Sequence, residues 1–274
     1  MKQFLKNLVL SLLHLIRKII SVMLDHAIPP SPHDPHNSHD ELRDLYYHYR
    51  KDELRDSYYH YRKDELRDSY NHFKKYFHDA IFLEPGRIRE YAINEAMQNH
   101  KPGYYYIEFG VWTGSSINMF SEILKDIKIY GFDSFEGLKE DWKGHSLPKK
   151  QFNLNKQIPC LNDNCVPVIG WIQDTLPKFI SEHKDLDINF VHIDTDTYPT
   201  ARFILQQIKP YLINDAIIMF DELYDFTGWR VGEYKALTEV FKEEEYKFLV
   251  FSKTSTKVVI QIKKYNPANS HENS

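Results

Sequence analysis

Residues 106–116 read Tyr-Ile-Glu-Phe-Gly-Val-Trp-Thr-Gly-Ser-Ser, and this stretch decides the fold. An apolar run at 104–107 predicts a strand that ends at Glu108, and two glycines, Gly110 and Gly114, come next. Residues 115–124 then have the pattern of a helix. A strand that breaks at glycines and restarts as a helix lets a ligand approach bare backbone at the carboxyl edge of a sheet. The stretch therefore predicts a site for a nucleotide-like cofactor.

A second acid follows at the spacing that such a fold requires. The apolar run 128–133 ends in Asp133, 25 residues after Glu108, where an acid usually binds ribose hydroxyls. A dinucleotide fold has G-x-G-x-x-G, whereas this chain has G-x-x-x-G after an acid that repels phosphate. The pattern resembles the first motif of class I S-adenosylmethionine-dependent methyltransferases.

Two further apolar runs end in acids. Residues 188–194 end in Asp194, and residues 215–221 end in the pair Asp221-Glu222, with a helix pattern at 200–212 between them. The carboxyl ends of parallel strands lie along one edge, so these acids and Asp196 should meet near Glu108 and Asp133. Carboxylates in one cleft repel each other unless a cation joins them, and oxygen ligands favour Mg²⁺ or Mn²⁺.

Five segments in order resemble the macrocin O-methyltransferase family, which consists of metal-dependent sugar O-methyltransferases of macrolide biosynthesis. The segments are 108–114, 130–138, 170–177, 192–198 and 220–223, and the resemblance covers roughly 85–262. It implies S-adenosylmethionine as cofactor and a sugar, glycoside or similar small hydroxyl acceptor. It also implies that the acid ending the fourth strand binds the metal and is the general base, while the pair ending the fifth strand completes the metal site. The family usually has two Asp residues in that pair, and Glu222 departs from this pattern.

The resulting assignments fall into three groups. The metal ligands are expected to be Asp194, Asp221 and Glu222. The catalytic residues are expected to be Asp194 and Asp196, because Thr197 stands where related catechol-type enzymes have a lysine. The cofactor-binding residues are expected to be Glu108, Gly110, Gly114, Ser115, Asp133, Ser134 and Asp174, of which Asp174 is placed by the family's contact with the adenine amine. A branched side chain at Gly110 is expected to fill space that the cofactor needs and to leave the fold intact.

Structural interpretations of the same residues remain open. Glu108 could cap the helix that follows it, Asp133 could serve a turn, and Asp196 could cap the helix after Pro199. His192 lies within a strand pattern, where a histidine is more often packed in the core than bound to a ligand. Cys160 and Cys165 form a C-x₄-C pair without further Cys or His partners, which is weak evidence for zinc.

Composition excludes some classes of function. A net charge of −4 and a pI near 6.4 show no overall nucleic-acid footprint. Two cysteines suit a reducing compartment, so the chain is expected in the cytoplasm.

The first 25 residues differ from the rest of the chain. They predict a basic amphipathic helix that lies on the inner membrane surface through residues 1–24 or packs on a partner. Its apolar face consists of Phe4, Leu5, Leu8, Leu12, Leu15, Ile16, Ile19 and Met23. The run is too short and too charged to span a bilayer. Residues 26–39 are rich in proline and are expected to form an extended linker.

Residues 40–75 contain three copies of a 12-residue repeat, at 40–51, 52–63 and, altered, at 64–75. A 12-residue step turns a helical stripe by about 120°, so the copies do not share one seam and a long coiled coil is not expected. The segment is interpreted as a charged, Tyr-rich helical spacer or as an arm for homo-oligomerisation.

The prediction for residues 79–264 is a three-layer α/β methyltransferase domain with a Rossmann-like, mostly parallel sheet. The runs 246–251 and 257–262 predict a hairpin that supplies the antiparallel closing strand. Residues 140–159 are the expected lid, and 265–274 a frayed tail. Two alternatives to a methyltransferase remain: a nicotinamide-dependent oxidoreductase of doubly wound fold, and a non-catalytic scaffold docked on a membrane.

Overall fold

The computed structural model describes residues 38–140 and 152–263, with side chains from Arg50 onward. The predicted amphipathic helix at 1–25, nearly all of the linker, most of the expected lid and the tail lie outside the described residues. Among the described residues, no helix combines the length and the apolar character needed to cross a bilayer.

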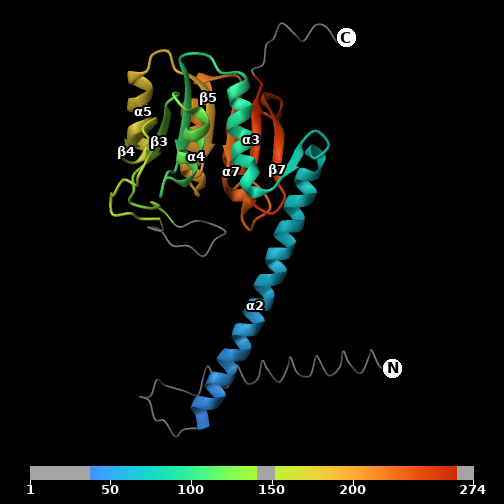
Figure 1. Cartoon of the computed structure of the whole chain (residues 1–274). Coiled ribbons are helices and arrows are strands. Elements are labelled where there is room, and N and C mark those ends of the chain that lie inside the picture. Colours follow the sequence, from blue (N-terminus) through green and yellow to red (C-terminus); the bar gives the residue numbers. More distant parts are fainter. Residues whose placement is uncertain (1–37, 141–151, 264–274) are drawn as a thin grey trace. The chain divides into compact units, whose positions relative to one another are not determined.

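The domain is built on one eight-stranded sheet (Figure 1). In spatial order the strands are β1 (Ile81–Leu83), β7 (Tyr246–Ser252), β8 (Val258–Ile262), β6 (Leu212–Phe220), β5 (Asp187–Ile193), β2 (Tyr104–Phe109), β3 (Ile129–Asp133) and β4 (Cys165–Ile169). Strand β8 is antiparallel to β6 and β7, and the other pairs are parallel. The predicted hairpin and antiparallel closing strand are confirmed.

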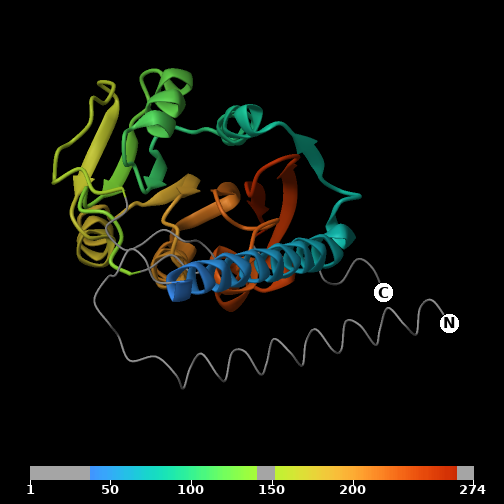
Figure 2. The same ribbon diagram turned by 90° about the horizontal axis from the view of Figure 1, so that it is seen from below.

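Five α-helices cover the two faces of the sheet. Helices α3 (Pro85–Gln98) and α4 (Ser115–Leu124) pack on one face, and α5 (Ile172–Glu182), α6 (Tyr198–Ile208) and α7 (Glu233–Val240) pack on the other. Figure 2 shows the teal α3 and green α4 on the opposite side of the strands from the yellow α5. The buried residues divide into two clusters, one between the sheet and each helical layer. The predicted three-layer α/β fold is confirmed.

Burial of both sheet faces explains why the central strands are apolar without alternation. In β5 every residue after Asp187 is buried, and all five residues of β8 are buried. Such continuous apolar runs are typical of parallel strands that are covered on both sides. Because β2, β3, β5 and β6 run parallel to one another, the loops that follow them all leave the same edge of the sheet.

Helix α2 (Ser38–Phe73) contains nearly all of the repeats. The chain divides into two compact units, 1–57 and 58–274, so the third copy of the repeat belongs to the same unit as the sheet. Phe73 is fully buried, and its ring packs against those of Trp229, Tyr234 and Phe251.

Two polar contacts join the same part of α2 to the loop that follows β6. Asp68 accepts two hydrogen bonds from the Arg230 guanidinium, and the Ser69 hydroxyl accepts one from the backbone N–H of Asp225. The third copy of the repeat therefore packs on the domain, whose predicted start is residue 79. Tyr61, one repeat before Phe73, is 51% exposed, so equivalent positions of the repeat differ in burial.

Candidate active site

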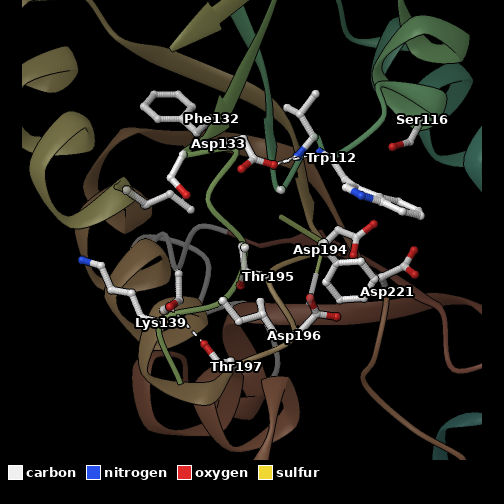
Figure 3. Close-up of a pocket in the computed structure, with 18 of the residues that line it drawn as sticks. Trp112, Ser116, Phe132, Asp133, Lys139, Asp194, Thr195, Asp196, Thr197 and Asp221 are labelled. Carbon is white, nitrogen blue, oxygen red and sulfur yellow. Dashed lines mark hydrogen bonds between the residues drawn. The ribbon is translucent and has the colours of Figure 1, made fainter. Parts of the chain in front are cut away.

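The loops at the carboxyl edge of the sheet surround a cavity of about 420 Å³ (Figure 3). Five carboxylates line it: Asp133, Asp194, Asp196, Asp221 and Glu222. Only two cationic side chains do so among the described residues, those of Arg89 and Lys139. The cavity therefore favours a cationic ligand over an anionic one.

Gly110 allows the ends of β2 and β5 to approach each other closely. Its φ is +91°, and a Cβ atom added there would lie 1.8 Å from the carbonyl oxygen of Asp194. A backbone hydrogen bond of 2.9 Å from Asp194 N–H to the Phe109 carbonyl fixes this approach, and another of 2.9 Å from Gly110 N–H to the Phe132 carbonyl joins the end of β2 to β3. The expectation that a side chain here would spare the fold is wrong, because it would collide with backbone before it reached any cofactor.

Asp133 organises the glycine turn. Its Oδ2 accepts hydrogen bonds of 2.8 Å from the backbone N–H groups of Val111 and Trp112, and its Oδ1 accepts one of 2.7 Å from Phe135 N–H. A carboxylate has about four acceptor positions, so one remains for a ligand hydroxyl. Figure 3 shows Asp133 joined to Trp112 at the upper side of the cavity.

The other residues expected to bind a cofactor separate into two groups. Ser115 and Ser134 line the cavity together with Gly110 and Asp133. Glu108, Gly114 and Asp174 are not among the lining residues. The cavity lining therefore does not support a direct ligand contact at these three positions.

Glu108 lies beneath the cavity and is fully buried. Its Oε1 accepts hydrogen bonds from the Ser116 hydroxyl and from His192 Nδ1, the latter over 3.2 Å. Gly114 begins α4 with a φ of +81°. Asp174 is exposed in the first turn of α5, whereas its neighbours Trp171 and Gln173 line the cavity.

Asp221 is surrounded by three basic side chains. Its Oδ1 lies 3.1 Å from Arg89 Nη2 and 3.4 Å from His192 Nε2, and its Oδ2 lies 2.6 Å from Lys257 Nζ. The sequence analysis missed Arg89 and Lys257 and interpreted His192 as a core residue. A signal existed for Lys257, since Phe220 pairs with Val258 in the antiparallel ladder and Asp221 follows directly. No signal in the sequence connects Arg89, on α3, with this edge.

Burial and mutual repulsion shift the pKa values of the acids that line the cavity. Burial, reinforced by the charge of Asp221, raises the pKa of Asp194 to about 7. Burial and the charge of Asp194 raise the pKa of Asp196 to about 8. Burial would raise the pKa of Asp221 too, but the His192 hydrogen bond and the Lys257 charge hold it well below its usual range.

The same surroundings shift the pKa values of His192 and Glu222. Burial alone would lower the pKa of His192, but its hydrogen bonds to Asp221 and Glu108 raise it to about 9. Burial and the charges of Asp221 and Asp194 raise the pKa of Glu222 well above its ordinary value. The edge therefore holds a cationic histidine paired with acids, beside acids that resist ionisation.

The three expected metal ligands are divided between two overlapping groups of possible ligand atoms. In one, the ligand atoms of His192, Asp194 and Asp221 lie within 4.8 Å of one another, and in the other those of Asp194, Asp196 and Glu222 do. Asp194 belongs to both, and Figure 3 shows it between Asp221 and Asp196.

From these pKa shifts we expect the metal-free protein to lose stability as the pH rises from about 5 to 8. Folded Asp194 and Asp196 keep their protons to about pH 7 and 8, whereas the unfolded chain releases them near 3.8. The folded state then binds more protons, so the free energy of unfolding falls with pH. His192 also lowers the stability as the pH rises, because its pKa is about 9 in the folded protein and 6.5 in the unfolded chain.

Urea unfolding in excess chelator at a series of pH values would measure this loss. The double variant Asp194→Asn/Asp196→Asn is the control, and its stability should fall less steeply with pH, because only Glu222 and His192 of these groups still titrate. A midpoint that rises from pH 5 to 8 in the unaltered protein would contradict the assignment.

Comparisons with known proteins concern the domain and its fold. Residues 107–223 match a family model described as a methyltransferase domain. The solved structure of CalS11, a calicheamicin methyltransferase, has a TM-score of 0.52 at 20% identity, covering 63% of this chain and 76% of that one. The O-methyltransferase NovP has a TM-score of 0.47 at 18% identity, covering 65% and 79%. No curated protein matches the chain. The chain thus contains a match to a methyltransferase domain at residues 107–223, in a Rossmann-like fold of the kind seen in CalS11.

Proposed function

We propose that this chain is an S-adenosylmethionine-dependent, metal-assisted O-methyltransferase of the macrocin type, acting on a hydroxyl of a sugar, glycoside or similar small acceptor. The observation that carries the proposal is the acid-lined cavity at the carboxyl edge of the sheet. Its volume of about 420 Å³ falls in the range of small-molecule sites, roughly 300–1,000 Å³.

The charge of the cavity separates the proposed cofactor from a dinucleotide. S-adenosylmethionine carries a positive sulfonium, whereas a nicotinamide dinucleotide carries a pyrophosphate, and the cavity has five acidic side chains against two basic ones. The glycine turn offers no phosphate site either, because Asp133 Oδ2 already accepts the N–H groups of Val111 and Trp112. The remaining acceptor position of Asp133 suits a ribose hydroxyl.

The roles of the residues follow from their positions. Asp133 would hold the ribose, and the ring of Trp112, which is 46% exposed and lines the cavity, would cover the cofactor from solvent. Asp194 would take the proton of the acceptor hydroxyl, and its raised pKa of about 7 suits a general base near neutral pH. Asp196 would support it, since Thr197 supplies no base. Holding the two reactants close together would supply much of the rate.

The same edge fits a divalent cation. Glu222 Oε2 is buried and has no hydrogen-bond partner in the described part of the chain, and the neighbouring acids offer the oxygen ligands that Mg²⁺ and Mn²⁺ prefer. A bound cation would lower the pKa of the acceptor hydroxyl.

Cofactor titration tests the proposal. Isothermal titration should show binding of S-adenosylmethionine and no binding of NAD⁺ or NADH. Asp133→Ala should weaken the affinity by more than about 10-fold, because both the glycine turn and a ribose contact depend on this carboxylate. Asp174→Ala is the control and should change the affinity little, since Asp174 is exposed outside the cavity. Binding of NADH in place of S-adenosylmethionine would refute the proposal.

Several expectations from the sequence remain proposals. They are membrane contact through residues 1–24 on the inner face, a cytoplasmic location, homo-oligomerisation through 40–75, and a lid at 140–159. Partition of the full chain and of residues 25–274 onto anionic vesicles would test the first, because only the full chain should bind.

A further inference from the structure

Asp221 differs from the other acids of the cavity because both of its carboxylate oxygens are already paired. Oδ1 is shared by Arg89 and His192, and Oδ2 is held 2.6 Å from the ammonium of Lys257. A divalent cation on this carboxylate would have to displace one of these groups or lie next to it. Positive charges at such short separation repel strongly in a buried site.

Both ring nitrogens of His192 are also already paired. Its Nδ1 faces Glu108 Oε1 at 3.2 Å and its Nε2 faces Asp221 Oδ1 at 3.4 Å, so each ring nitrogen has an acidic partner. A histidine binds a metal through an unprotonated nitrogen, and this ring has none to offer between two carboxylates. The group formed by His192, Asp194 and Asp221 is thus an internal ion-pair network, in which the positive charge is already supplied.

The second group of acids lacks such partners. Within residues 50–140 and 152–263, no cationic side chain lies within 4 Å of the carboxylate oxygens of Asp194, Asp196 or Glu222. Glu222 is only 9% exposed and lines the cavity, yet its Oε2 has no hydrogen-bond partner in the described part of the chain. The buried hydroxyl of Thr195, which lies between Asp194 and Asp196 in the sequence, has none there either. Unpaired polar atoms beside a cavity are available to a ligand.

We infer that the divalent cation of the proposed function is held by Asp194, Asp196 and Glu222, and that Asp221 is a positioning residue instead of a ligand. The inference rests on the proposed function for the presence of the cation, and its ligand set differs from the one expected from the sequence. Asp196 replaces Asp221 because Arg89, Lys257 and His192 already neutralise Asp221. Glu222, which follows the paired Asp221 in the sequence and has a longer side chain, supplies the third carboxylate oxygen to the cation.

Metal binding to the full chain, measured with Mn²⁺ by electron paramagnetic resonance and without acceptor, tests the ligand set. Asp196→Asn and Glu222→Gln should each weaken Mn²⁺ binding by more than about 10-fold, since even residues that only support metal ligands have effects of that size. The matched variant is Asp221→Asn/Lys257→Met, which removes an anion and its cation together. It should lose clearly less than either ligand variant, because it removes no ligand and leaves the net charge beside the metal unchanged.

Two outcomes would overturn the inference: undetectable Mn²⁺ binding by the unaltered chain, or a loss in the double variant as large as in Asp196→Asn. Far-ultraviolet circular dichroism would establish that each variant is folded. If the double variant does not fold, anomalous diffraction from the unaltered protein with Mn²⁺ decides the matter. Manganese bonded to Asp196 supports the inference, and manganese bonded to Asp221 with Lys257 displaced refutes it. Failure to bind S-adenosylmethionine while Mn²⁺ binds as expected would refute the proposed function alone.

Discussion

Replacing Gly110 by alanine should prevent the domain from folding stably. The new Cβ atom would lie 1.8 Å from the Asp194 carbonyl oxygen and 2.8 Å from its carbonyl carbon, and both are backbone atoms between two hydrogen-bonded strand ends. The residue would also have to keep a φ of +91°, which L-amino acids avoid. We expect a loss of more than about 4 kcal/mol in the free energy of unfolding, among the largest effects of single substitutions.

Gly86 provides the control, because it lies in the first turn of α3 and has no atom within 4 Å of an added Cβ. Gly86→Ala should be neutral or stabilise the domain by up to about 1 kcal/mol, since alanine favours a helix over glycine. Urea unfolding of both variants measures the difference. A Gly110→Ala protein as stable as Gly86→Ala would show that β2 and β5 do not meet as described.

Asp194→Asn should reduce kcat for methyl transfer by roughly 10²- to 10⁴-fold, the usual contribution of a general base. The amide keeps the shape of the side chain but removes both the proton acceptor and a ligand charge. Affinity for S-adenosylmethionine should change much less, because the ribose site at Asp133 is untouched. The separation of kcat from cofactor affinity distinguishes a catalytic role from a loss of fold.

Asp196→Asn is the matched comparison, two residues away in the same cavity. It should reduce kcat less than Asp194→Asn does, because Asp196 is expected to bind the cation without being the principal base. Saturating Mn²⁺ should restore part of the Asp196→Asn activity and little of the Asp194→Asn activity. Equal losses that Mn²⁺ restores equally would assign the base to another group.

The sequence predicted the order and faces of the main elements because they depend on local patterns. The run before Glu108, the glycines after it and the acid-ended runs at Asp194 and Asp221 became β2, β5 and β6 with their loops. Meeting of the acids at one edge followed from the direction of parallel strands alone. Ser115 and Ser134 line the cavity because they neighbour the predicted turns.

Contacts between distant segments could not be predicted from these local patterns. Arg89 reaches Asp221 from α3, 132 residues away, and no periodicity encodes that contact. Glu108 looked like a cofactor ligand from its motif, yet its carboxylate faces Ser116 and His192 beneath the cavity. Phe73 looked like one more repeat position, although it lies in the core of the domain.

Transfer of a labelled methyl group from S-adenosylmethionine to a panel of glycosides and nucleotide sugars tests the account most directly. We expect an acceptor to be methylated on a hydroxyl. Excess chelator should stop the transfer and leave the affinity for S-adenosylmethionine nearly unchanged, and Mg²⁺ or Mn²⁺ should restore the transfer. Full turnover in excess chelator would contradict the account, because the carboxylates beside Glu222 would then serve the reaction without a cation.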